Sequence, residues 1–113
     1  MPHLVIEHSN DVLVQTDTKT LIETTVNAAM DSALFEVPHI KARTLDYGHI
    51  FVGGTDKGFI HVVARILSGR TIEQRQHLSS TLLKALQNMS LKELSITVEV
   101  VEMERESYSK HIC

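Results

Sequence analysis

The first residues of the chain, Met1-Pro2-His3, offer the clearest chemistry in the sequence. Methionine aminopeptidase removes Met1 when the next residue is small, and the Pro2 nitrogen would then be a free secondary amine. An α-amino group titrates near about 7.7–8.0, and burial or neighbouring cations lower that pKa. An amine with a pKa close to the working pH suits general-base catalysis. Pro2 is therefore the candidate catalytic residue, while the structural alternative is a proline that only sets the backbone of a chain terminus.

Other reactive groups in the sequence are poorly arranged for chemistry. There is no HExxH motif and no cysteine cluster, and the histidines lack ligand spacing, so we expect no metal and no cofactor. The only cysteine, Cys113, is the last residue and has no fixed partner that would activate its thiol. Residues 53–58 form a glycine-rich segment without a Walker or GxGxxG pattern. This segment predicts a hairpin connection rather than a phosphate-binding loop.

The composition is that of an ordinary globular protein. The chain has 113 residues, with 42% hydrophobic and 22% charged residues and a net charge of −3. We expect one domain over residues 1–113, with a polar, partly ordered tail at 104–113. The charge indicates neither nucleic acid nor an anionic membrane as a partner, and no apolar run approaches a transmembrane length. A single cysteine excludes an internal disulfide, so a cytoplasmic location is expected.

Four stretches read as strands. Apolar residues alternate or cluster over residues 3–8, 40–45, 59–67 and 93–103, and turn-forming residues bound these runs. The run over residues 59–67 is the most continuous of the four.

Two further stretches read as helices. Asp17 caps the first, and its apolar face is predicted from the spacing of Ile22, Val26, Ala29, Met30 and Ala33. This helix must end before Pro38. Thr71 and Gln74 form a capping box for the second helix, which runs to about residue 88. Its inner face is predicted to contain Leu78, Leu82, Leu86 and Met89.

The order of these elements is strand–helix–strand, repeated once. Parallel pairing within each half requires a right-handed crossover, which puts both helices on one face of the sheet. The sequence therefore predicts an α+β fold of duplicated β-α-β units. Its core is a four-stranded mixed sheet with two helices on one face.

The other face of this sheet is left uncovered by the predicted helices. It carries apolar residues among charged ones, namely Val5, Phe59, Val63, Leu67 and Val101 with His3, Glu7, His61, Arg65 and Glu99. Half-apolar sheet faces of this kind mark interaction surfaces. We expect a homo-oligomer that packs these faces together, and the alternative is a back face exposed to water.

Three segments at matching spacing carry a resemblance to a known family. They are PHLVIEHS at the start, HIKAR in the second strand, and FIHVVARILSGRTIEQRQ in the middle of the chain. With them the chain resembles the tautomerase superfamily and, within it, the 5-carboxymethyl-2-hydroxymuconate isomerases. The resemblance extends to about residue 101. It implies a tautomerase-like homotrimer that moves a proton along a conjugated dienol carrying several carboxylates, without a cofactor.

The resemblance also implies roles for particular residues. Pro2 would be the acid–base group, and Lys41, Arg43 and Arg70 would bind the carboxylates of a small-molecule substrate. Arginine grips a carboxylate with two parallel hydrogen bonds, and cations stabilise negative charge on an intermediate. Lys41 stands where the family has an arginine, so the bidentate grip is lost there and substrate choice is expected to differ. The structural alternative is that Lys41 and Arg43 are solvated strand residues and that Arg70 only precedes a helix cap.

Two alternative functions remain open from the sequence. The first is another proline-dependent activity of the same superfamily, such as a decarboxylase, a dehalogenase or a phenylpyruvate-type tautomerase. The second is a non-catalytic trimeric binding protein. His3 and His61 are expected to be structural residues of the back face.

Overall fold

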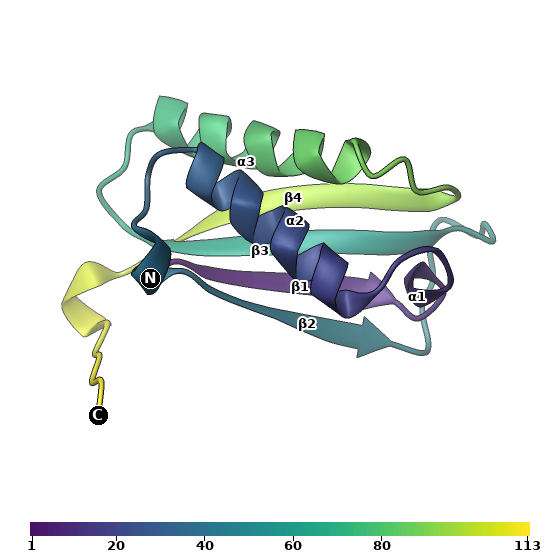
Figure 1. Cartoon of the computed structure of the whole chain (residues 1–113), viewed down its shortest axis with the longest axis horizontal. Helices are drawn as coiled ribbons and strands as arrows, with labels where there is room; N and C mark the ends of the chain where they lie inside the picture. Colours follow the sequence, from purple (N-terminus) through teal and green to yellow (C-terminus); the bar gives the residue numbers. More distant parts are fainter.

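The computed structural model describes residues 1–113, and four strands in it form one mixed sheet in the order β2-β1-β3-β4 (Figure 1). The strands are β1 (His3–Ser9), β2 (Lys41–Tyr47), β3 (Gly58–Leu67) and β4 (Leu94–Met103). β1 is parallel to β2 and β3 is parallel to β4, whereas the central pair β1 and β3 is antiparallel. The predicted parallel pairing within each half is confirmed.

Both long helices, α2 (Thr18–Asp31) and α3 (Ile72–Gln87), lie on the same face of the sheet (Figure 1). The Asp17 carboxylate accepts a hydrogen bond from the Thr20 N–H at 2.7 Å, which satisfies one of the free amides at the start of α2. Thr71 and Gln74 form the expected capping box of α3. The predicted caps and the one-sided helical layer are therefore confirmed.

The core lies between the sheet and these two helices. Strand residues alternate in burial, so that one side chain in two points toward the helices. The core residues are Leu4, Ile6, Ile60, Val62, Ala64 and Ile66 from the sheet, Leu21, Ala28, Ala29, Leu78, Leu82 and Leu86 from the helices, and Val12. Each of these side chains is at most 3% exposed, so the core is dry and entirely on the helical side.

The buried face of α2 differs from the predicted one. Leu21, Thr25, Ala28 and Ala29 point inward, while Met30 is 39% exposed and Ala33 lies beyond the end of the helix. Thr25 fits the core because its hydroxyl donates a hydrogen bond to the Leu21 carbonyl oxygen at 2.8 Å. An apolarity pattern alone gives a threonine no reason to be buried, so the predicted face was rotated toward Met30.

The predicted hairpin after β2 is wrong. β2 and β3 are not neighbours, because each pairs with a different edge of β1. Residues 48–57 therefore pass the end of β1 to connect the two strands. Three short helices were also missed: α1 (Val12–Gln15), η1 (Val37–His39) and η2 (Arg105–Ser107). No helix in the structure is long and apolar enough to cross a membrane.

The second face of the sheet, called the open face here, has no helical layer in this chain (Figure 1). Because β1 and β3 are antiparallel, the starts of β1 and β2 lie at the same end of the sheet as the finishes of β3 and β4. We call this the Pro2 end, and the opposite one, where residues 48–57 lie, the far end.

Candidate functional site

Pro2 lies at the start of β1, next to the edge strand β2. Its side chain is buried, and its carbonyl oxygen accepts a hydrogen bond from the Lys41 backbone N–H at 3.0 Å. Met1 precedes it, acylates the proline nitrogen and packs partly against the core. The sheet hydrogen bonding therefore gives Pro2 a fixed position beside Lys41, as an acid–base group requires.

The two predicted basic residues of β2 share the open face at this end. The strand register puts Lys41 beside His3 and Arg43 beside Val5. Both side chains are exposed, and the Arg43 guanidinium donates a hydrogen bond to His3 Nδ1 at 3.2 Å. Lys41 and Arg43 thus lie on one surface with the residue that follows Pro2.

A third cation, Arg65, joins them from β3. The antiparallel register pairs Arg65 with His3 across the sheet, and the Arg65 side chain is exposed. Sequence reasoning had assigned Arg65 only to an interface between copies, because the register of β1 against β3 is a long-range property. One signal was available in the sequence. Arg65 comes four residues after His61 in the same strand, so side-chain alternation places both on one face.

Burial and the charges gathered at this end lower the pKa values of nearby groups. Partial burial lowers the pKa of His3, and the charges of Arg43, the chain's amino terminus, Lys41 and Arg65 lower it further. The pKa of the Met1 amino group is also lowered, first by burial and then by Lys41 and Lys110. An amine at this end of the sheet is thus biased toward its neutral, basic form.

Arg70 lies at the Pro2 end, but its side chain contacts residues outside the cluster of Pro2, Lys41 and Arg43. Its guanidinium donates a hydrogen bond to the Leu34 carbonyl oxygen at 2.6 Å and lies over the Phe35 ring, 5.7 Å from the centroid. It is not among the charges that shift the pKa of His3 or of the Met1 amine. Within one chain, the structure therefore brings together Pro2, Lys41 and Arg43 but not Arg70.

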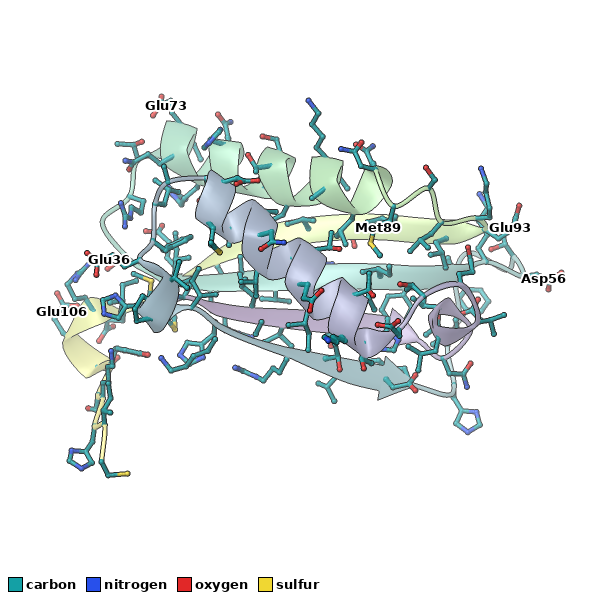
Figure 2. The ribbon with its side chains drawn as sticks, in the orientation of Figure 1. Glu36, Asp56, Glu73, Met89, Glu93 and Glu106 are labelled. Atoms are coloured by element: carbon teal, nitrogen blue, oxygen red, sulfur yellow. The ribbon has the colours of Figure 1, made fainter.

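The cations of the open face have no acidic partner within the chain. The ion pairs are His8–Asp46, Lys19–Glu23, His39–Glu36, His61–Glu99 and Arg75–Glu102. Glu36 and Glu106 lie at the same end of the molecule (Figure 2), yet neither pairs with Lys41, Arg43 or Arg65. This surface is therefore suited to bind a group that brings its own negative charge.

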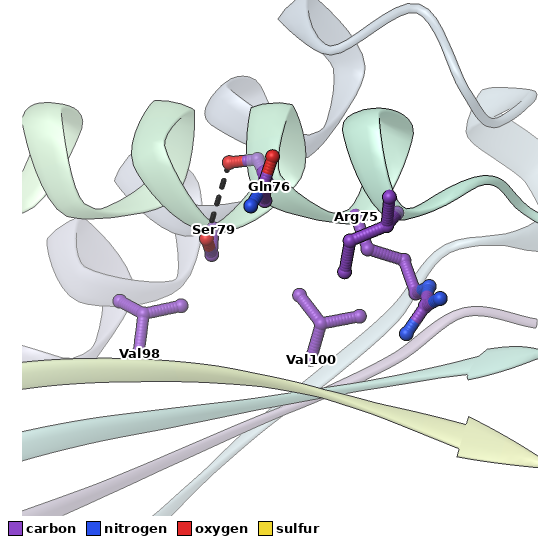
Figure 3. A pocket seen from close by; sticks show the side chains of 6 residues that line it. Arg75, Gln76, Ser79, Val98 and Val100 are labelled. Carbon is purple, nitrogen blue, oxygen red and sulfur yellow. Dashed lines mark hydrogen bonds between the residues drawn. The ribbon is translucent and has the colours of Figure 1, made fainter.

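The two hollows in the surface of the chain lie elsewhere. One of about 180 Å³ lies between α3 and β4 (Figure 3), and one of about 340 Å³ lies between α2 and α3. The first is lined by Ile72, Arg75, Gln76, Ser79, Val98 and Val100. Pro2 lines neither, so within one chain the cationic surface is open and lacks an enclosing wall. No group of His, Cys, Asp and Glu side chains is arranged to hold a metal ion.

Comparison with known proteins identifies the family of the chain. The family model described as 5-carboxymethyl-2-hydroxymuconate isomerase matches residues 2–112. The chain belongs to this family. It is thereby an isomerase of the tautomerase superfamily, as the resemblance implied. No curated protein matches it in sequence.

Solved structures of low sequence identity share the fold. A 5-carboxymethyl-2-hydroxymuconate isomerase from Deinococcus radiodurans R1 is 18% identical, with a TM-score of 0.84 over 97% of this chain and 88% of the other. A 5-carboxymethyl-2-hydroxymuconate delta-isomerase is 17% identical, with a TM-score of 0.80 over 100% of this chain and 89% of the other. An F6 fused 4-OT, described as an asymmetric trimer, is 15% identical, with a TM-score of 0.78 over 96% and 91% of the chains.

Proposed function

We propose that the chain isomerises an unsaturated, enolic di- or tricarboxylate of the 5-carboxymethyl-2-hydroxymuconate type, with Pro2 as the acid–base group after removal of Met1. The observation that carries this proposal is the convergence of Lys41, Arg43 and Arg65 beside Pro2, with no carboxylate to neutralise them. The residue roles rest on this clustering and on membership of the family.

The proposed reaction is a proton transfer. The free Pro2 nitrogen takes the proton of the enol oxygen, and the O–H electron pair becomes the π bond of a carbonyl group. The conjugated double bonds shift along the chain, and the protonated Pro2 returns the proton to a carbon atom. Burial and the charges of Lys41 and Lys110 lower the pKa of the Met1 amine, and the same causes, one residue farther on, are expected to favour the neutral Pro2 amine that starts this cycle.

The cations have two tasks in this mechanism. Lys41 and Arg43 hold carboxylates of the substrate, and their charge stabilises the dienolate that forms when the enol proton leaves. Arg65 adds to the same field from β3. Lys41 offers a point charge and not a planar fork, so it tolerates more than one carboxylate geometry. Arg70 can bind a substrate carboxylate only if its guanidinium first leaves the Leu34 carbonyl oxygen and the Phe35 ring.

We also propose that the working molecule is a homotrimer whose sheets pack by their open faces. Support comes from this uncovered face and from the trimeric form described for the F6 fused 4-OT. A neighbouring copy would supply the wall that the Pro2 end lacks. Sedimentation at micromolar concentration tests this, since a single species of one chain's mass contradicts it. The cytoplasmic location stays a prediction.

Two measurements test the function. Intact mass spectrometry of protein purified from its own host should show a chain shorter by one methionine. Ultraviolet absorbance should then follow turnover of 5-carboxymethyl-2-hydroxymuconate, with malonate semialdehyde and phenylpyruvate as comparison substrates. Retained Met1 together with no turnover favours a binding protein, because an acylated proline nitrogen has no basic lone pair.

A further inference from the structure

The C-terminal tail returns to the Pro2 end and contacts the residues of the site. β4 finishes beside β3 at this end, and η2 and the tail that follows it lie there too, near the amino terminus (Figure 1). The Arg105 guanidinium donates a hydrogen bond to the Ser68 carbonyl oxygen at 2.9 Å, and the charge of Lys110 acts on the amino terminus. The part of the chain that the sequence left without a role is thus held at the Pro2 end by the hydrogen bonds of Arg105 and Tyr108.

Tyr108 makes the most specific of these contacts. Its hydroxyl lies 3.0 Å from His3 Nε2, and the two rings meet edge to face with centroids 6.1 Å apart. The other nitrogen of the same imidazole, Nδ1, accepts a hydrogen bond from Arg43. One histidine therefore connects a residue of the tail with a cation of the candidate site.

The hydrogen bonds determine which tautomer His3 adopts. A guanidinium can only donate, so Nδ1 must be the acceptor and the hydrogen of neutral His3 resides on Nε2. Nε2 then donates to the Tyr108 oxygen. The alternative tautomer carries a hydrogen on Nδ1, which faces the donor of Arg43 and breaks that bond. The Tyr108 hydroxyl accepts that hydrogen and so holds the ring with Nδ1 facing Arg43.

From this arrangement we propose that Tyr108 is a positioning residue, which through His3 holds the Arg43 guanidinium at the Pro2 end for a substrate carboxylate. This inference rests on the proposed function and extends it, because it makes the C-terminal tail part of the carboxylate-binding end. Arg43 is otherwise a long, exposed side chain, and fixing it beforehand reduces the entropy lost on binding.

The test is Tyr108→Phe, which removes one hydroxyl and keeps the ring. We expect KM for 5-carboxymethyl-2-hydroxymuconate to rise about three- to tenfold with kcat within twofold, the effect of one lost hydrogen bond. The matched control is Tyr47→Phe, because the Tyr47 hydroxyl also bonds a charged side chain of β1, Glu7, but toward the far end. Its KM should equal that of the wild type.

A double-mutant cycle separates positioning from simple packing. In a His3→Phe background the Tyr108→Phe substitution should have no further effect on KM, because the connection to Arg43 is already broken. Additive effects of the two substitutions, or an unchanged KM in Tyr108→Phe, would overturn the proposal.

A spectroscopic readout is independent of turnover. Nitrogen-15 NMR of the imidazole should show His3 as the Nε2–H tautomer in the wild type. In Tyr108→Phe the Nδ1 signal, which reports the hydrogen bond from Arg43, should shift because the ring is no longer held toward the guanidinium. An identical Nδ1 signal in both proteins would overturn the proposal. If the wild type does not turn over 5-carboxymethyl-2-hydroxymuconate, the proposed function fails, and these spectra still decide whether Tyr108 orders His3.

Discussion

Charged side chains are paired toward one end of the open face and unpaired at the other. Toward the far end, the Tyr47 hydroxyl donates to Glu7 at 2.7 Å. His61, the cross-strand neighbour of Glu7 on β3, bonds Glu99 at 2.6 Å through Nε2 and Thr97 at 2.7 Å through Nδ1. At the Pro2 end, three cations from two strands surround one histidine, and the cations have no acid among them.

This difference separates charges that stabilise the fold from charges that are free to bind an anion. A charge that is paired within its own chain is satisfied, and the pair contributes little beyond local order at an exposed site. Like charges gathered without a partner repel one another, and an anion, a substrate or another chain would relieve that repulsion. The proposed function therefore assigns the reaction to the Pro2 end and a structural role to the far end.

The largest effect is expected from Pro2→Ala. The substitution leaves an amino-terminal amine but replaces the rigid ring nitrogen, and loss of a positioned acid–base group lowers kcat by about 100-fold or more. Steady-state absorbance measurements at several pH values check this. Pro38→Ala, at an exposed position of η1, is the matched control and should keep wild-type kcat. A wild-type kcat in Pro2→Ala would contradict the assignment of the reaction to the Pro2 end.

The next effect concerns the unpaired cations. Lys41→Ala and Arg43→Ala should each lower kcat/KM by about 10- to 100-fold, because each removes a charged hydrogen bond to the substrate. Lys57→Ala, in the connection at the far end, offers the same chemical change without the substrate contact and should have wild-type kcat/KM. Equal losses from Lys41→Ala and Lys57→Ala would mean that only net charge matters.

At the far end, substitutions should change stability and not chemistry. A Cβ atom on Gly58 would collide with the Asp11 carboxylate and the Ser9 hydroxyl. Gly58→Ala should therefore lower the free energy of unfolding by about 1–3 kcal/mol while kcat stays unchanged. Urea unfolding at fixed protein concentration measures this. Gly48→Ala is the control, because its nearest contact would be an ordinary 3.9 Å to Asn10. A fall in kcat for Gly58→Ala would link the two ends.

The smallest expected effect is on the pH dependence of the free energy of unfolding. The pKa of His3 is lowered in the folded chain, by burial first and then by the surrounding cations. The unfolded chain therefore binds a proton more readily, and the stability contributed above about pH 6.5 is lost as the pH falls through the lowered pKa. The free energies of unfolding of the wild type and His3→Phe should converge between pH 7.5 and pH 5. A constant difference would contradict the cationic environment assigned to His3.

Most of the fold was accessible to sequence reasoning because its signals are local. The capping residues Asp17 and Thr71 begin both long helices as predicted, and strand alternation separates the core face from the open face. The predicted face of α2 was partly right, since Ala29 is buried and Ile22 and Val26 pack against the core. It missed Thr25, because a satisfied hydroxyl does not register in an apolarity pattern. The hairpin predicted at residues 53–58 was wrong, because strand order depends on long-range pairing and not on the residues of the turn.

The candidate site was accessible only in part, for the same reason. Pro2, Lys41 and Arg43 were predicted from the start of the chain and from the resemblance of one short strand, and the structure places them at one end of the sheet. The nearness of Arg65 and Tyr108 to His3 was not predicted, because it depends on strand register and on the position of the tail.

By itself the sequence determined the two long helices and the four strands, which strand face meets the helices, and that a proline follows Met1. Caps and side-chain periodicity act over a few residues, so they can be read directly from the chain. Only the tertiary structure decided that His3 lies between Arg43, Arg65 and Tyr108, and that Arg70 lies over Phe35. Those neighbours are far apart along the chain, and sheet hydrogen bonding and core packing alone bring them together.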